Sequence, residues 1–277
     1  MLRDLSEILG SDTPDVRICD VGAMGLEGPS PFEPLLSLPR VEVIGFEPNE
    51  KECADLTKTA PKGRRYYPYF IGNGKPGTFR FCEWNATSSL YEPNMPLLSL
   101  ISDLPHLLRV KSREDVETTR LDDVPDLGRV DFLKIDVQGA TLDVLHGAPK
   151  TLADAVVVQC EAEFVPLYKG EPLFAEIDLE MRKHGYLLHQ FLGIANRSFA
   201  PLRRPPHTEG GQALWTDAIY VKSFLELDKL APEALLRLAL IVERQCHSPD
   251  LGLLALKHYD AKTGAELHRE YLDSLRG

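Results

Sequence analysis

Two stretches of this chain decide its fold: Cys19-Asp20-Val21-Gly22-Ala23 and Val43-Ile44-Gly45-Phe46-Glu47-Pro48-Asn49. Each is an apolar run that ends in a turn, and Glu47 follows Gly22 by 25 positions. In a strand-helix-strand unit, this spacing places Glu47 at the carboxyl end of the strand beside the glycine turn, where a carboxylate can bind both hydroxyls of a ribose. The pair therefore predicts a site for a cofactor that carries a nucleoside.

The turn after the first stretch differs from the one that binds dinucleotides. A dinucleotide fold carries Gly-x-Gly-x-x-Gly, because the pyrophosphate must approach backbone amides at the start of a helix. Here the glycines are Gly22, Gly25 and Gly28, and Asp20 precedes them, where its charge would repel a pyrophosphate. An acidic residue at this position suits the ammonium group of S-adenosyl-L-methionine better than NAD. The alternatives are a tight turn without a ligand and, for Glu47, a solvated loop charge.

Apolar and amphipathic runs alternate along the chain, which indicates an α/β fold with a mostly parallel sheet and helices on both faces. We expect strands at 16–21, 41–46, 65–71, 78–82, 130–136, 155–160, 186–191 and 215–221, and helices at 50–59, 139–146 and 173–184. The third and fourth strands should pair as a hairpin across the glycine-rich turn at 72–77. Residues 84–115 show a weak pattern and are interpreted as a long loop beside the pocket.

Composition divides the chain into two parts. Residues 1–224 should form the α/β domain, and residues 225–277, rich in Leu, Ala, Glu and Arg, should form a C-terminal helical extension. One face of that extension is apolar and should be packed; it holds Leu230, Leu235, Leu238, Ile241 and Val242. The sequence leaves open whether this face meets the sheet, a second copy in a homodimer or another partner.

Charge and composition exclude several classes of protein. The chain has 277 residues and a formal net charge of −11, which disfavours a nucleic-acid binder because phosphate affinity rests on clustered Lys and Arg. No stretch is long and apolar enough for a membrane span, and the first residues lack the apolar core of a signal peptide. The five cysteines are widely spaced, so we expect reduced thiols and a cytoplasmic protein.

Lys134 stands in a predicted central strand, two residues before Asp136. Alternation puts both side chains on one face of the strand, and a buried lysine needs a carboxylate partner. The pair is either a structural ion pair or part of an active site. In the second case Asp136, at the carboxyl end of the strand, orients an acceptor hydroxyl or accepts its proton while Lys134 tunes it.

Five motifs, in order along the chain, resemble those of the FkbM-type methyltransferases, a branch of the class I S-adenosylmethionine-dependent enzymes. They are Asp20-Val21-Gly22-Ala23, Gly45-Phe46-Glu47-Pro48-Asn49, Ser88-Ser89-Leu90-Tyr91, Thr119-Arg120-Leu121-Asp122-Asp123-Val124 and Phe132-Leu133-Lys134-Ile135-Asp136-Val137-Gln138-Gly139. The resemblance covers about residues 14–222. It implies a seven-stranded, Rossmann-like sheet ending in an antiparallel hairpin, and methyl transfer to a hydroxyl of a small molecule, sugar or glycan. Gln138 departs from the family pattern, which usually has Glu.

The strand ends and the resemblance together select the candidate site residues. For S-adenosyl-L-methionine they are Asp20, Gly22, Ala23, Glu47, Pro48, Asn49, Ser88, Ser89 and Asp136. For catalysis they are Asp136, Lys134 and Glu161.

A metal site and a different base are the alternatives at this site. Glu161 and Glu163 follow a predicted strand and could join Asp136 as ligands of Mg²⁺, since hard cations take carboxylate oxygens. No spacing makes that ligand set compelling, so we predict no metal. Among the histidines, His189 is the remaining candidate base.

Three functions follow from this sequence. The first is an O-methyltransferase that acts on a hydroxylated small molecule or glycan. The second is an NAD-dependent oxidoreductase, which the missing glycine pattern disfavours. The third is a non-catalytic cofactor-binding or assembly protein that keeps the fold.

Overall fold

The apolar runs form one central sheet in the computed structural model, which describes residues 4–25, 30–205 and 210–276. Seven of its strands follow the order β10-β12-β9-β8-β1-β2-β3, and β11 pairs with β12 beyond the end of β10. The bounds are β1 (Val16–Val21), β2 (Val41–Phe46), β3 (Arg64–Tyr67), β8 (Phe132–Ile135), β9 (Val157–Glu163), β10 (Tyr186–Phe191), β11 (Ala195–Arg197) and β12 (Gln212–Lys222).

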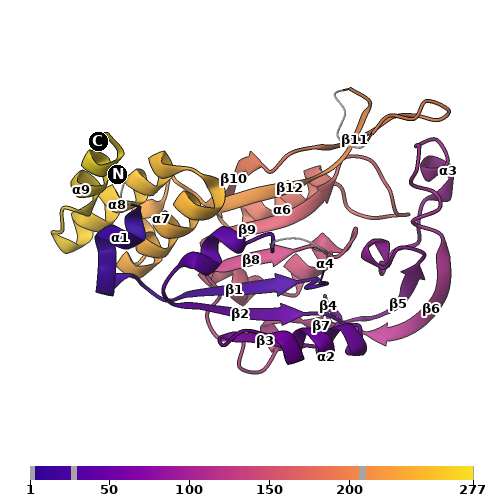
Figure 1. Ribbon diagram of the computed structural model, residues 1–277, viewed down its shortest axis with the longest axis horizontal. Coiled ribbons are helices and arrows are strands. Elements are labelled where there is room, and N and C mark those ends of the chain that lie inside the picture. The colour runs from indigo at the N-terminus through magenta and orange to yellow at the C-terminus, as the bar shows by residue number, and fades with distance from the viewer. Residues whose placement is uncertain (1–3, 26–29, 206–209, 277) are drawn as a thin grey trace.

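This sheet is mostly parallel, as predicted. Only pairs that involve β12 are antiparallel among the strands of this sheet that the structure describes. The parallel strands β1, β2 and β8 end at the same edge, on the side of the two-stranded ribbon of β5 (Pro76–Cys82) and β6 (Val110–Glu117) (Figure 1). Ligands of open parallel sheets bind outside the carboxyl ends of the strands, so this edge is the place to look for a site.

Helices cover both faces of the sheet. One face carries α4 (Thr141–His146), α5 (Pro149–Asp154) and α6 (Phe174–Lys183), whose buried residues share an apolar core with Leu133 and Ile135. The other face shares a core with the remaining helices, which are α1 (Leu5–Leu9), the 3-10 turn η2 (Glu33–Ser37), α7 (Pro232–Cys246), α8 (Pro249–Thr263) and α9 (Leu267–Arg276). Helix α2 (Glu50–Thr59) contacts β3 at the sheet edge.

The C-terminal helices pack on the chain's own sheet. In α7 the predicted apolar positions Leu235, Leu238, Ile241 and Val242 are fully buried, in one core with Val16 and Phe132. This contact covers the apolar face whose partner the sequence left open.

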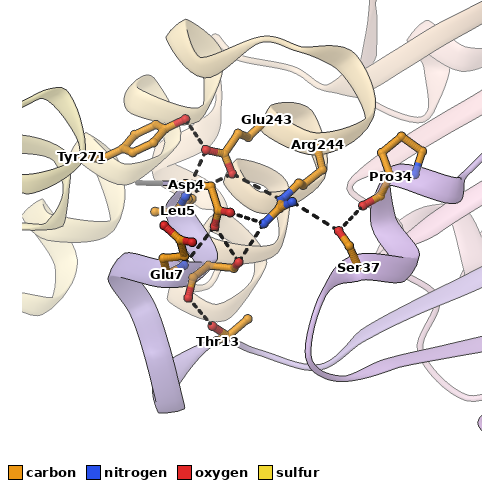
Figure 2. Close-up of polar contacts among 10 residues, drawn as sticks. Asp4, Leu5, Glu7, Thr13, Pro34, Ser37, Glu243, Arg244 and Tyr271 are labelled. Carbon is orange, nitrogen blue, oxygen red and sulfur yellow. Dashed lines mark hydrogen bonds and ion pairs between the residues drawn. The ribbon is translucent and has the colours of Figure 1, made fainter. Parts of the chain in front are cut away.

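A polar cluster joins α1, η2 and α9 to α7 (Figure 2). Arg244 of α7 forms an ion pair with Asp4 at 2.6 Å and donates a hydrogen bond to Ser37 of η2 at 3.2 Å. Its neighbour Glu243 accepts a hydrogen bond from the buried Tyr271 hydroxyl of α9 at 2.6 Å. These contacts tie both ends of the described chain to the helix that covers the sheet.

The predicted hairpin between the third and fourth strands is wrong, because the fourth strand pairs with a different segment. The third predicted strand stops at Tyr67, and β5 (Pro76–Cys82) pairs antiparallel with β6 (Val110–Glu117) instead of with the strand before it. Separately, β4 (Ile71–Gly72) pairs with β7 (Thr119–Arg120). The sequence did not reveal β6 because most of its side chains on both faces are exposed, so no apolar alternation marks it.

The stretch predicted as a long loop forms a small lobe with its own core. It contains the 3-10 turn η3 (Asn85–Thr87), helix α3 (Met95–Leu98) and the first strand residues of β6. Its buried residues Leu98, Ile101, Leu104 and Leu108 pack with Leu167 and Tyr168 of the segment after β9 and with Leu214 of β12. Further 3-10 turns lie at Gly10–Asp12, Leu121–Asp123 and Leu227–Lys229. In the described part of the chain, no helix is both long and apolar enough to cross a membrane.

Candidate active site

A cavity of about 690 Å³ opens at the carboxyl edge of the sheet. Its volume falls within the roughly 300 to 1,000 Å³ that is usual for small-molecule sites. The ends of β1, β2 and β8 form one wall, and residues 30–33, 69–71 and 85–90 form much of the rest. Among the predicted site residues, Asp20, Gly22, Ala23, Glu47, Pro48, Ser88, Lys134 and Asp136 line it.

The turn after β1 needs glycine because the end of β8 lies against it. Gly22 has a φ of +83°, and a Cβ there would lie 1.9 Å from the Asp136 carbonyl oxygen. The amides of Gly22 and Ala23 both donate to the Phe46 carbonyl, at 3.1 and 2.9 Å. Since these amides are already engaged, they are not available to a diphosphate. Gly28, the third glycine of the sequence pattern, lies outside the described residues.

Lys134 and Asp20 form a buried ion pair on the cavity wall. The Lys134 Nζ lies 3.0 Å from the Asp20 carboxylate and 3.6 Å from that of Asp136, and it donates to the Gly22 carbonyl at 3.1 Å. Burial alone would lower the pKa of Lys134, but Asp20 and then Asp136 outweigh it and raise that pKa. Lys134 is therefore a fixed cation, and its nearer partner is Asp20 rather than the predicted Asp136.

Glu47 is a buried carboxyl group at the end of β2. Its residue is 3% exposed, and its Oε1 accepts a hydrogen bond from the Asn49 amide at 2.8 Å. Burial raises the pKa of Glu47 to about 7. Asn49 uses its side chain to cap α2 and borders an adjoining pocket of about 420 Å³ rather than the main cavity. The hydrogen bond to Asn49 fixes the direction of the Glu47 carboxyl group.

The two serines of the lobe have different positions. Ser88 lines the cavity, and its hydroxyl accepts a hydrogen bond from the Cys82 amide at 3.1 Å. Ser89 is fully buried outside the cavity lining, where its hydroxyl donates to the Gln138 carbonyl at 2.5 Å and accepts from the Tyr91 amide at 2.9 Å. Ser89 thus joins the lobe to the loop that follows β8.

Gln138 brings Asp136 and Glu161 together. Asp136 lies at the cavity wall with a side chain that is 36% exposed, whereas Glu161 is buried behind it in β9. The Gln138 Nε2 donates to the Asp136 Oδ1 at 3.1 Å and to the Glu161 Oε2 at 2.8 Å. Burial and then the charge of Asp136 raise the pKa of Glu161. The two predicted catalytic carboxylates are therefore close, and one amide connects them.

Three further carboxyl groups among the described residues lie at this end of the sheet, and the sequence analysis did not identify two of them, Asp217 and Glu171. Asp217 stands opposite Glu161 in the β9–β12 ladder, and burial followed by the charge of Asp136 raises its pKa to about 6. Behind them, burial raises the pKa of Glu163 to about 7 and that of Glu171 to about 9. The antiparallel register of β12 places Asp217, and a single sequence gives no register between distant strands.

The structure bears on two alternatives raised by the sequence, a metal site and His189 as the base. Among the residues that the structure describes, no group of three or more His, Cys, Asp or Glu side chains is placed to hold a metal ion. His189 lies in β10 and does not line the cavity, and burial lowers its pKa. On the strand-end wall of the cavity, the ionisable side chains are the carboxyl groups of Asp20, Glu47 and Asp136 and the ammonium group of Lys134.

Comparison with known proteins identifies the family of this chain. The model of the methyltransferase FkbM domain matches residues 20–188. A relative in Sinorhizobium fredii (strain NBRC 101917 / NGR234), 2-O-methyltransferase NoeI, is 29% identical over 182 residues, which are 61% of this chain and 72% of the relative. A solved structure of a proposed methyltransferase from Thermoplasma acidophilum covers 80% of this chain and 77% of its own, at 10% identity and a TM-score of 0.38, too low to establish a shared fold. Because the family match spans more than half of its length, the chain belongs to the FkbM methyltransferase family.

Proposed function

We propose that the protein is an S-adenosyl-L-methionine-dependent O-methyltransferase that acts on a hydroxyl group of a small molecule, sugar or glycan. The observation that carries the proposal is one cavity that joins Glu47, the Asp20–Lys134 pair and the half-exposed Asp136. A carboxyl group that can bind ribose hydroxyls and a carboxylate that can face an acceptor hydroxyl are thereby placed at one edge of one sheet.

The residues present fit S-adenosyl-L-methionine better than NAD. Glu47 and Pro48 would hold the nucleoside, and Asp20 would face the amino-acid end. NAD would need free backbone amides for its diphosphate, but those of Gly22 and Ala23 already donate to Phe46. The first regular element described after β1 is the short 3-10 turn η2, which offers no α-helix start for an anion.

The cofactor, when bound, supplies an electrophilic methyl group attached to a sulfonium. The residues of the chain then align the acceptor and remove a proton from its hydroxyl. Asp136 would perform the second task, and the Lys134 ammonium lies 3.6 Å from its carboxylate. A well-placed general base contributes a factor of about 100 to 10,000, and alignment of reactants contributes roughly 7 to 11 kcal/mol.

The charges at this end of the cavity favour an uncharged, hydroxyl-rich acceptor. Asp136, Glu161 and Asp217 lie near one another, and Lys134 is already paired with Asp20. An anionic acceptor would be repelled by these groups, whereas a sugar hydroxyl can donate a hydrogen bond to Asp136, the one of the three that lines the cavity. The relative named 2-O-methyltransferase supports methyl transfer to oxygen.

Calorimetric titration of the purified chain with S-adenosyl-L-methionine, its demethylated product and NAD tests the cofactor. We expect both adenosyl compounds to bind and NAD not to bind. Binding of NAD without S-adenosyl-L-methionine would establish the oxidoreductase alternative instead.

Incubation with methyl-labelled cofactor and a cell extract tests the reaction. We expect label in a hydroxylated compound, and we expect Asp136→Asn to abolish the labelling while cofactor affinity stays within a few fold. Asp115→Asn, in the exposed part of β6, is the matched control. Tight cofactor binding without any labelled product would favour the non-catalytic alternative.

A further inference from the structure

The backbone at Gln138 is held in a conformation that residues other than glycine seldom adopt. Its φ is +51°, in the left-handed region. The Ser89 hydroxyl holds its carbonyl at 2.5 Å, and the next residue, Gly139, has a φ of +82°, where a Cβ would lie 2.5 Å from a carboxyl oxygen of Glu171. The close contacts at its carbonyl group and at Gly139 therefore fix the backbone of Gln138, from which its side chain extends.

The orientation of the Gln138 amide follows from its neighbours. The two N–H groups of Nε2 match the two carboxylates, at 2.8 Å from Glu161 and 3.1 Å from Asp136. The Oε1 accepts a hydrogen bond from the buried Tyr168 hydroxyl at 3.2 Å. A reversed amide would place Oε1 against two carboxylates, so the orientation seen is the favourable one.

We infer that Gln138 is a positioning residue whose uncharged amide holds Asp136 toward the cavity and joins it to Glu161. This inference rests on the proposed function. The two hydrogen bonds from the amide hold both carboxyl groups in place, and the neutral side chain adds no charge where the charge of Asp136 already raises the pKa of Glu161 and of Asp217.

A glutamate at position 138 would reverse these effects. It has nearly the same shape but offers no N–H group, and at neutral pH it would add a third carboxylate in contact with two others. Because burial and the charge of Asp136 already raise the pKa of Glu161, a further carboxylate in the variant would make ionisation of the whole cluster harder and would move it to higher pH.

The test compares Gln138→Glu with Gln190→Glu, the same substitution in β10, where the amide donates to the Cys246 carbonyl. In the methyl-labelling assay from pH 5 to 9, we expect Gln138→Glu to move the acidic limb of the rate profile upward by about one pH unit or more, with cofactor affinity within a few fold. Gln190→Glu should leave the profile unchanged. An unshifted profile in Gln138→Glu, with the unmodified protein active, would overturn the inference and leave the proposed function intact.

A second readout does not depend on turnover. Thermal unfolding of Gln138→Glu should show a melting temperature that falls increasingly below that of the unmodified protein between pH 5 and 8, because the added carboxylate is held near two others only in the folded state. Gln190→Glu should show a smaller trend, because its side chain faces one uncharged carbonyl rather than two carboxyl groups. If Gln138→Glu does not fold, Gln138→Met removes the N–H groups without adding charge, and we expect a lower labelling rate at unchanged cofactor affinity. A pH-independent melting difference in Gln138→Glu, or a fully active Gln138→Met, would contradict the bridge itself.

Discussion

At the ends of β1, β2 and β8 the cavity wall buries its charges, whereas in the β5–β6 ribbon the charges lie nearer the surface. The side chains of Asp20 and Lys134 are 10% and 6% exposed, but those of Glu92, in the lobe segment beside the ribbon, and Arg113 of β6, which form an ion pair, are 33% and 53% exposed. Buried charges are costly unless each has a partner, while exposed pairs are screened by water. The comparison indicates that the stability of the strand-end wall depends on a few buried ion pairs. The stability of the ribbon depends instead on the contacts within its lobe.

The largest effect should follow from Lys134→Met. The variant leaves Asp20 buried without its cation, and breaking such a pair costs about 3 to 5 kcal/mol. Urea-induced unfolding at pH 7 measures the loss. The double variant Asp20→Asn, Lys134→Met removes both charges and should recover part of the stability. Equal stability of Lys134→Met and the unmodified protein would show that the pair is not a structural requirement of this wall.

Glu47→Gln should have a smaller effect that depends on pH. Because the pKa of Glu47 is raised from its ordinary value near 4.5 to about 7, its contribution to stability is fully present below pH 4.5 and is lost as pH rises through 7. The variant should not show this loss, so its free energy of unfolding at pH 8, relative to pH 5, should exceed that of the unmodified protein by about 1 to 3 kcal/mol.

Denaturant unfolding at the two pH values measures this difference. Glu50→Gln, in the exposed first turn of α2, is the control and should behave like the unmodified protein. A parallel pH trend in Glu47→Gln and the unmodified protein would mean that Glu47 is not the group that titrates.

Ser89→Ala tests the contact between the two regions. The substitution removes the hydrogen bond that the lobe donates to the Gln138 carbonyl and should cost about 1 to 2 kcal/mol. It should also weaken the pH-dependent behaviour assigned to Gln138, because the loop after β8 loses one of its anchors. Ser99→Ala, whose exposed hydroxyl bonds to the Pro96 carbonyl, is the matched control, and a similar stability of the two variants would speak against the anchor.

The smallest effect should come from Glu92→Gln, whose side chain pairs with one arginine of each strand of the ribbon. Glu92 pairs with Arg80 and Arg113, each at 2.8 Å, and the hydrogen bond from Arg80 contributes most to lowering its pKa. Since the site is partly solvated, we expect a loss of less than about 1 kcal/mol in unfolding experiments. A loss as large as that of Lys134→Met would remove the distinction between the two regions.

The same distinction explains which parts could be predicted from sequence. The strand-end wall is built from residues that are close along the chain to a buried strand, so Asp20, Gly22, Glu47 and Asp136 follow from apolar runs and the turns after them. These residues line one cavity because β1, β2 and β8 are parallel neighbours whose carboxyl ends meet at one edge.

The ribbon and the acceptor end depend on pairings that the sequence does not encode locally. Strand β6 pairs with β5, but the residues of the lobe separate the two strands along the chain. Because β6 has few buried side chains, its polar sequence resembles that of a loop. Asp217 reaches Glu161 through the antiparallel register of β12, and Ser89 reaches Gln138 from a segment 49 residues away. Such long-range contacts follow from the fold as a whole.

Helices α1 and α9 contact each other at the end of the molecule opposite the β5–β6 ribbon (Figure 1). A surface that holds the protein through these two helices would therefore leave the cavity mouth open to solution. The same contact makes a circular permutant practical: a short linker can join α9 to α1, and new ends can be opened in the exposed turn between α8 and α9, at Gly264. Such a permutant would show whether the sheet folds independently of the order in which its covering helices are synthesised.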